Sequence, residues 1–186
     1  MVNKTVVGID VAGSKKGFAL AAYDTLEKTW LELRHVQSHV EVLDIINRLS
    51  NVGCIAIDCP PKAIIDGAET RSAERELKRK GYNMQWTRRR STDLEPQEWM
   101  SNGQRLWEVL TPLHGKLLIE TFPTAACDSA ADCEMNIPLC KFAGKVTRDH
   151  YKDIVDAALC AWVAQKKLLG LAQMAGLDDE LGPIYY

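Results

Sequence analysis

Acidic side chains follow three short apolar runs in this sequence, and they are the residues best placed to do chemistry. Asp10 lies near the end of TVVGIDV, Asp58 ends CIAID, and Glu120 lies near the end of LLIETF. A carboxylate at the end of a buried strand is costly to bury unless an opposite charge accompanies it. Three acids in equivalent places indicate a shared counter-charge, and a divalent cation would provide it.

Two more acids, Asp153 and Asp156, stand at i and i+3 in the first turns of a helix predicted over residues 151–169. That spacing places both on one helix face. Either one alone has a simpler role open to it, because acids near a helix N-terminus stabilise the helix dipole. The five acids together, without a histidine cluster, favour Mg²⁺ or Mn²⁺, since hard cations prefer oxygen ligands. Two such ions would activate water and stabilise a leaving oxygen.

These acids depend on a sheet that aligns them. Residues 5–11, 18–24 and 30–36 are predicted to form an antiparallel meander, because short turn segments separate the three runs. A capping box at Ser38 begins a helix with an apolar face, and residues 54–58 then form a strand parallel to the first. Parallel strands bring their carboxyl ends to one edge, where open α/β sheets bind ligands.

The middle of the chain is basic. Residues 66–90 contain eight Lys or Arg residues against four acids, and the net charge of the whole chain is −2. Helices are expected over residues 69–80, where Glu74 is placed to pair with Lys78, and over residues 101–110. A third buried strand is expected over residues 117–122.

Side chains of this basic region are candidates for contact with a nucleic acid. Arg71, Arg75 and the run Arg88-Arg89-Arg90 are candidates for phosphate contacts. The aromatic residues that interleave with them, and that could stack on bases, are Tyr82, Trp86 and Trp99. The alternative is a solvated helix with an exposed loop, which is the usual role of a charge run. Without a helix-turn-helix or zinc-finger pattern, sequence-specific reading of DNA is not expected.

Composition indicates one cytoplasmic domain over residues 1–186. The chain has 186 residues, of which 46% are hydrophobic and 26% charged, with neither a signal-peptide pattern nor an apolar run of membrane-spanning length. A membrane partner is therefore not expected, and the oligomeric state stays open. None of the six cysteines forms a CxxC pair. Cys127, Cys133 and Cys140 are spaced more loosely than zinc knuckles, which favours reduced thiols and leaves structural zinc as the alternative.

Four segments in order, GIDVAGSKKGFALA, IAIDCPP, IETFPTAAC and DIVDAALCAWVA, together with the closing GPIYY, resemble a family of predicted nucleases. It is the family numbered four hundred and twenty-nine among domains of unknown function, and the resemblance runs from about residue 5 to the end. It implies a ribonuclease H-like, three-layer α/β/α fold. The implied sheet is mixed and five-stranded, of order 3-2-1-4-5, and residues 62–112 form a helical insertion between strands 4 and 5.

The DxxDA motif that begins at Asp153 also resembles the last helix of the RuvC family of Holliday-junction resolvases. In that superfamily, acids of the first strand, the fourth strand and the last helix bind two Mg²⁺ ions for phosphodiester hydrolysis. The resemblance implies Asp10, Asp58 and Asp156 as core ligands, with Asp153 beside them and Glu120 as an addition of the family. The expected function is therefore a Mg²⁺- or Mn²⁺-dependent nuclease acting on DNA or RNA.

Two other functions stay open. The same scaffold could bind a nucleic acid or nucleotide without catalysis, or it could hydrolyse small nucleotides. The segment GIDVAGSKKG is similar to the phosphate-holding turn of sugar kinases and actin-like ATPases, which suggests Lys15, with Ser14 and Lys16, as a phosphate ligand. Those proteins use two such domains, and this chain is long enough for one, so a plain hairpin turn is the alternative.

Overall fold

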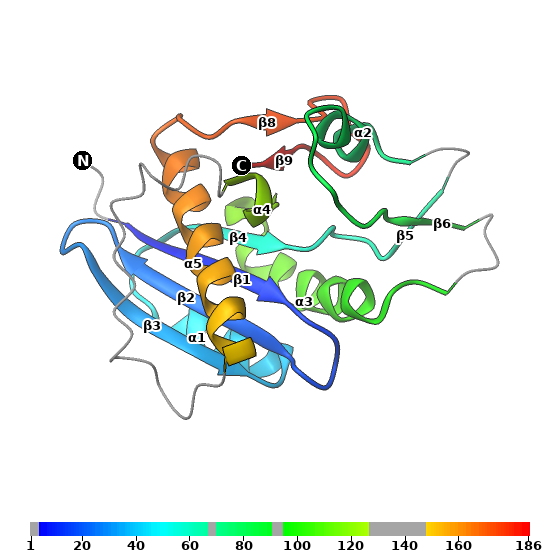
Figure 1. Cartoon of the computed structure of the whole chain (residues 1–186). Coiled ribbons are helices and arrows are strands. Elements are labelled where there is room, and N and C mark those ends of the chain that lie inside the picture. Colours follow the sequence, from blue (N-terminus) through cyan, green and yellow to red (C-terminus); the bar gives the residue numbers. More distant parts are fainter. Residues whose placement is uncertain (1–3, 67–69, 91–94, 127–147) are drawn as a thin grey trace.

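The computed structural model describes residues 4–66, 70–90, 95–126 and 148–186. It has a mixed α/β architecture in which a central sheet carries helices on both faces (Figure 1). The strands of this sheet are β1 (Thr5–Val11), β2 (Phe18–Asp24), β3 (Thr29–Val36), β4 (Val52–Asp58), β7 (Leu118–Thr121), β8 (Met174–Ala175) and β9 (Ile184–Tyr185). The helices are α1 (His39–Arg48), α2 (Ser72–Arg79), α3 (Glu98–His114), the short α4 (Pro123–Ala126) and α5 (Arg148–Leu168).

The strand order is β3-β2-β1-β4-β7-β9-β8. Strands β1, β2 and β3 form the expected antiparallel meander, and β4 lies parallel to β1 as expected. The expectation of a five-stranded sheet is wrong, because β9 and β8 extend the sheet beyond β7. These two short strands come from the chain after α5, which returns along β7 and pairs with backbone groups that an edge strand would leave open.

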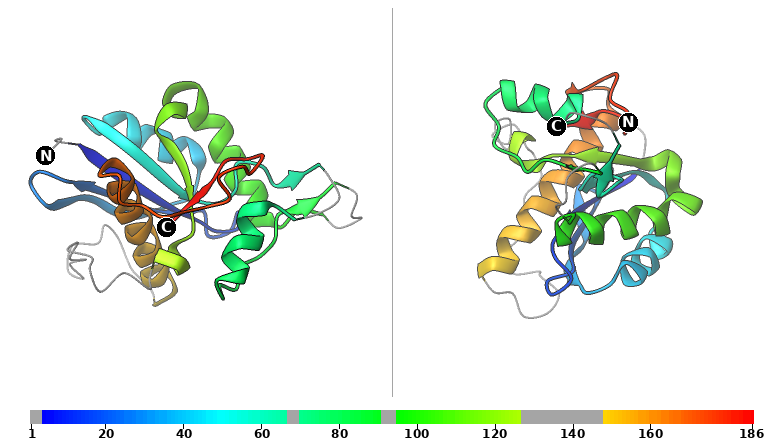
Figure 2. Two further views of the ribbon diagram at one scale, coloured as in Figure 1. Left: turned by 90° about the horizontal axis from the view of Figure 1, so that it is seen from above. Right: turned by 90° about the vertical axis from the view of Figure 1, so that its right-hand side faces the viewer.

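The segment 62–112 supplies α2, α3 and a separate two-stranded sheet of β5 (Ile64–Ile65) and β6 (Arg88–Arg89). Figure 1 and the left view of Figure 2 show this small sheet lying away from the central one. The expected pairing of Glu74 with Lys78 is not found. Glu74 is buried on the inner face of α2 beside Leu77, where its Oε1 accepts hydrogen bonds from the backbone and hydroxyl of Thr87.

The two faces of the sheet pack against different helices because side chains alternate along a strand. Val6 of β1 packs in one core cluster with α5, whereas Val7 and Ile9 pack in a second cluster with α1 and α3. Gly8 lies on the α5 side, where a Cβ atom would stand 2.0 Å from the carbonyl oxygen of Ala157. The glycine therefore lets the backbone of α5 lie directly on β1.

Within the described residues, no helix is long and apolar enough to cross a membrane. Cys54, Cys59 and Cys160 are buried free thiols, as their apolar surroundings in the sequence predicted. The three cysteines considered for zinc lie outside the described residues, and they are Cys127, Cys133 and Cys140.

The contact at Gly8 gives a stability prediction. Replacing Gly8 by Ala forces α5 off the sheet, because the new methyl group would overlap backbone atoms of Ala157 and Ala161. We expect a loss of about 3 kcal/mol of unfolding free energy in urea titrations. The control is Gly115→Ala, whose added Cβ finds its nearest neighbour at an ordinary 3.4 Å and should change stability by less than ~1 kcal/mol. Equal effects of the two changes would contradict the close approach.

Candidate active site

Asp10 and Asp58 lie directly beside each other on neighbouring parallel strands. They are register partners of β1 and β4, near the carboxyl end of each strand. Neighbouring strands are ~4.8 Å apart, so two side chains in the same register position face each other at short range. Alternation from Gly8 places Asp10 on the face covered by α5. Two carboxyl groups therefore share one place beneath the helix.

Helix α5 brings the other two aspartates to the same place. Ala157 and Ala161 contact the sheet at Gly8, and Asp153 lies one turn before Ala157 on the same side of the helix. Asp156 lies next to Ala157 in the same stretch. Both aspartates act on Asp10 electrostatically, which places them in its neighbourhood. The i, i+3 pattern in the sequence predicted that both lie on one side of the helix, and both are near enough to act on Asp10, while their role as metal ligands stays a prediction.

The site carries more negative charge than its surroundings balance. Burial raises the pKa of Asp10 to about 7, and the charges of Asp156 and Asp153 add to the rise. Burial also raises the pKa of Asp58 well above its usual range, followed by the effects of Asp10, Asp156 and Glu120. A carboxyl group with such a pKa gains from a cation or a proton, because either one removes the repulsion.

Two lysines and a histidine border the four aspartates. Lys152 Nζ lies 2.6 Å from Asp156 Oδ2, and Lys16 Nζ lies 3.4 Å from Asp153 Oδ2. On the other side of Asp153, His35 Nε2 lies 3.5 Å from Oδ2, and the His35 ring stacks on His150 at 4.2 Å. Burial, followed by the charge of His150, lowers the pKa of His35 from its ordinary value, which favours the neutral imidazole.

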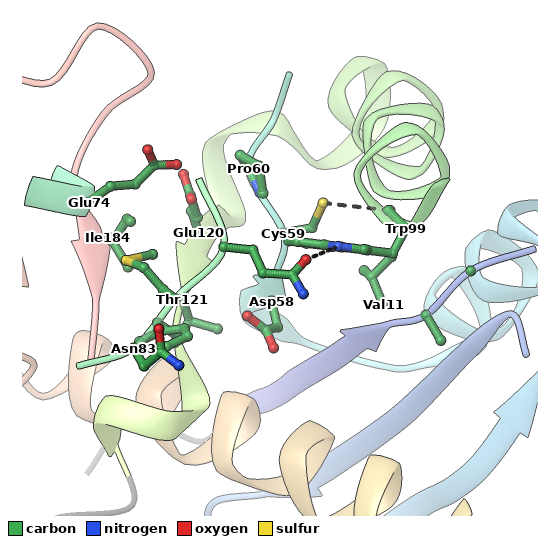
Figure 3. Close-up of a pocket in the computed structure, with 15 residues that line it drawn as sticks. Val11, Asp58, Cys59, Pro60, Glu74, Asn83, Trp99, Glu120, Thr121 and Ile184 are labelled. Atoms are coloured by element: carbon green, nitrogen blue, oxygen red, sulfur yellow. Dashed lines mark hydrogen bonds between the residues drawn. The ribbon is translucent and has the colours of Figure 1, made fainter. Parts of the chain in front are cut away.

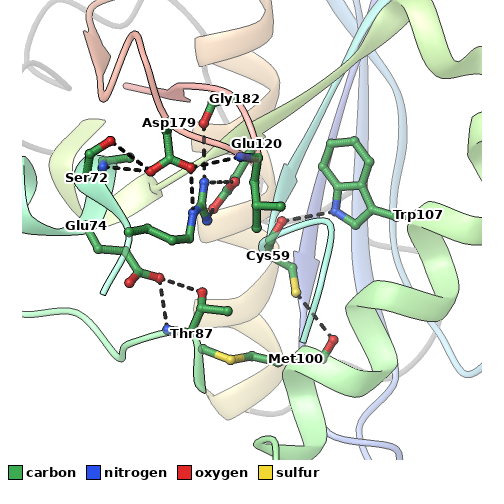
Figure 4. A network of polar contacts seen from close by, with 12 residues as sticks. Cys59, Ser72, Glu74, Thr87, Met100, Trp107, Glu120, Asp179 and Gly182 are labelled. Carbon is green, nitrogen blue, oxygen red and sulfur yellow. Dashed lines mark hydrogen bonds and ion pairs between the residues drawn. The ribbon is translucent and has the colours of Figure 1, made fainter. Parts of the chain in front are cut away.

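Glu120 belongs to a different network, on the opposite face of the sheet. Its register partner is Ile57, whose side chain packs toward α1 and α3. There Glu120 accepts two hydrogen bonds from Arg71, at 2.8 Å from Nη1 and 2.9 Å from Nη2 (Figure 4). Arg71 Nε also binds Asp179 at 3.0 Å. Glu120 thus points to the other face of the sheet from Asp10, although it lines one pocket together with Asp58 at the end of the strands, and Arg71 neutralises it.

Arg71 is not the surface cation that the sequence suggested. Its side chain is 0% exposed, so a nucleic acid on the surface would not reach it. Sequence reasoning missed Asp179. Its carboxylate accepts hydrogen bonds from Arg71, from the hydroxyl of Ser72 and from the backbone N–H of Ala73, at the N-terminus of α2. Asp179 is one of two adjacent aspartates in the segment after α5, and no sequence pattern indicates that it binds a residue so far away in the chain.

The other residues proposed to contact phosphate or bases divide between the surface and the interior. Lys15 is exposed on the turn between β1 and β2. Arg75 is half-buried and donates a hydrogen bond to the carbonyl of Thr70. The ring of Tyr82 packs against Phe122 and Tyr186, with ring centroids 6.3 Å apart in both pairs. Tyr82 is therefore engaged within the protein.

A pocket of about 400 Å³ lies beside the acidic site, between the ends of β1, β4 and β7 and the segment 62–112 (Figure 3). Asp58 and Glu120 line it, together with Trp99 of α3 and Met84. Trp99 is held in place because its indole N–H donates to Gln85 at 2.8 Å. No sequence pattern predicts this pocket, since its walls come from segments that are distant in the chain.

The donor set of the four aspartates suits a hard divalent cation, since all of their ligand atoms are carboxylate oxygens. In the described part of the chain, no three His, Cys, Asp or Glu side chains already stand close enough to hold a metal ion. In this arrangement Asp153 is paired with Lys16 and Asp156 with Lys152.

Comparison of the chain with protein-family models, with curated proteins and with solved structures finds no match.

The Arg71 network gives a second stability prediction. Arg71→Met leaves the buried carboxylates of Glu120 and Asp179 without their partner, so we expect a loss of about 3–5 kcal/mol in urea unfolding. The double variant Arg71→Met/Glu120→Gln should recover part of this loss, since it removes one unpaired charge. A change below ~1 kcal/mol in the single variant would show that the pair does not hold the fold.

The pKa of Asp10 gives a pH prediction for the metal-free protein. Its folded-state pKa of about 7 lies above that of the unfolded chain, so folding becomes less favourable as pH rises from about 4 to about 7. Asp10→Asn removes this cost and should be more stable than the wild type by about 4 kcal/mol at pH 8, with the difference vanishing near pH 4. Urea titrations in a chelator measure it, with exposed Asp44→Asn as control. A difference independent of pH would refute the assignment.

Proposed function

We propose that this chain is a divalent-metal-dependent nuclease that hydrolyses phosphodiester bonds of DNA or RNA. The observation that carries the proposal is the pairing of Asp10 with Asp58 on adjacent parallel strands, beneath a helix that adds Asp153 and Asp156. Buried like charges of this kind are maintained in proteins mainly where they have a use, and binding of metal ions is the use that oxygen ligands favour.

The arrangement of the strands supports a ribonuclease H-like layout as part of the proposal. The succession β3-β2-β1-β4-β7 has an antiparallel meander on one side and parallel strands on the other. Strands β9 and β8 and the segment 62–112 are then additions to that layout. The acids lie at the carboxyl ends of β1 and β4, which is where open α/β sheets place their ligands.

In this proposal Asp10 and Asp58 are the central metal ligands, and Asp153 and Asp156 complete the set from α5. The bound ions would supply activation of water and stabilisation of the leaving oxygen. Lys16 and Lys152 now pair with Asp153 and Asp156. When these carboxylates bind metal instead, the two lysines become available to bind a phosphate of the substrate. Glu120 stays with Arg71 and serves the fold of the pocket wall.

The test combines metal binding with catalysis. Mn²⁺ should raise the melting temperature of the wild type by several degrees, because a ligand that binds only the native state stabilises it. Asp10→Asn and Asp58→Asn should lose both this rise and cleavage of single- and double-stranded oligonucleotides. Asp44→Asn, which changes an exposed acid on α1, should retain both.

The outcomes separate the nuclease from its alternatives. A metal-dependent rise without cleavage of any DNA or RNA would replace the proposal by a non-catalytic binding protein. Hydrolysis of free nucleotides alone would replace it by a small phosphoryl-transfer enzyme. Cleavage that survives both Asp→Asn changes would show that the acids are not the site.

A further inference from the structure

The pocket beside Asp58 contains a buried polar atom that nothing in the described structure uses. Glu74 is 2% exposed and lines the pocket (Figure 3). Its Oε1 accepts hydrogen bonds from the backbone N–H and the hydroxyl of Thr87, at 2.9 and 2.5 Å. Its Oε2 has no hydrogen-bond partner among the described residues. A buried carboxyl oxygen without a donor is costly, so it points to a ligand that supplies one.

The rest of the pocket suggests the shape of that ligand. Trp99, Phe122 and Ile184 give it apolar walls, two of them aromatic. Asn83 and Gln85 add amide groups at its lining. Flat apolar walls bind flat rings, and amides recognise the donors and acceptors at a ring's edge. A volume of about 400 Å³ falls in the range of small-molecule sites and suits one ligand of nucleoside size.

The position of the pocket connects it to the acidic site. Asp58 lines the pocket and is also the register partner of Asp10. Glu120 acts electrostatically on Asp58, and Glu74 acts on Glu120, so the three acids follow one another across the pocket. A ligand whose ring reaches Glu74 therefore extends toward Asp58 at its other end.

We propose that this pocket binds a single unpaired nucleobase, with a base N–H donated to Glu74 Oε2 and the attached phosphate directed toward Asp58 and Asp10. Binding of the base is inferred from the pocket alone, whereas the placement of the phosphate rests on the proposed function. The shared chemistry is that of a nucleoside, which either a free nucleotide or an unpaired end of a strand supplies. Paired duplex DNA does not fit, because its bases are stacked and their edges engaged.

The first experiment titrates the full chain with adenosine, guanosine, cytidine and uridine by calorimetry, without metal. At least one should bind with a dissociation constant of ~1 mM or tighter. The bound nucleoside is then compared with an analogue in which the Watson–Crick-edge N–H is removed or methylated. The analogue should bind roughly ten- to hundred-fold more weakly, because it leaves Oε2 unpaired. No binding of any nucleoside at ~10 mM would overturn the proposal.

Glu74→Gln is the matched variant. Its side-chain oxygen can still accept from Thr87, while the amide group replaces the acceptor Oε2 by a donor. We expect the same roughly ten- to hundred-fold loss for the nucleoside and little loss for the analogue. If Glu74→Gln fails to fold, Asn83→Ala in the exposed part of the lining carries the test, with a several-fold loss expected. The control is exposed Asn47→Ala on α1, which should bind normally. Unchanged binding in both pocket variants would overturn the proposal.

Competition experiments distinguish the two sources of the base. Displacement of the bound nucleoside by single-stranded oligonucleotides identifies a strand end, and displacement by mononucleotides alone identifies a free nucleotide. Equal displacement by blunt duplex DNA would overturn the unpaired-base pocket. The nucleosides carry no phosphate, so their binding does not depend on the metal site. Nucleoside binding without metal-dependent cleavage would contradict the proposed nuclease activity and support the nucleobase pocket. Cleavage without nucleoside binding would support the nuclease activity and contradict the nucleobase pocket.

Discussion

The carboxyl groups of Asp10 and Asp58 repel each other across neighbouring strands, and the fold around them holds them together. Their register is set by the parallel pairing of β1 with β4, and Gly8 lets the backbone of α5 close over the same face. The strands and the helix are stabilised by apolar packing on both faces, which offsets the local electrostatic cost. Since the repulsion is intrinsic to the fold, whatever relieves it gains binding free energy, and a proton or a divalent cation are the simplest candidates.

Two acidic systems point to opposite faces of the sheet and meet at the pocket that Asp58 and Glu120 line, and they are balanced in opposite ways. On one face, Arg71 binds Glu120 through two hydrogen bonds and reaches Asp179, so this network is complete within the protein. On the other face, the lysines near the aspartates are exposed, and the pKa of Asp10 stays raised in their presence. A complete network fixes geometry, whereas an incomplete one has affinity for something else. The unbalanced face is therefore the better candidate for chemistry, although both faces contain acids at strand ends.

The sequence predicted what depends on short-range pattern. Alternation and apolar runs predicted β1 to β4, and the helical spacing of Asp153 and Asp156 predicted that both face the site. Ser38 caps α1 as expected, accepting from the N–H of Glu41. Strand ends alone did not reveal that Glu120 points to the opposite face, because that depends on its pairing with Ile57. The roles of Arg71, Asp179 and the pocket required segments about 50 to 110 residues apart, which local patterns do not relate.

The segment 62–112 then has a structural role before any role in binding. Some of its basic side chains make contacts within the protein. Arg71 binds Glu120 in the wall of the pocket, and Lys78 Nζ lies 4.7 Å from the centre of the Trp86 ring. With a net charge of −2, the chain has little long-range attraction for a polyanion. Recognition must therefore come from local contacts in a defined pocket, where flat walls and a few polar groups decide what binds. This favours recognition of a single nucleobase in the pocket over binding of a long duplex through its backbone charge.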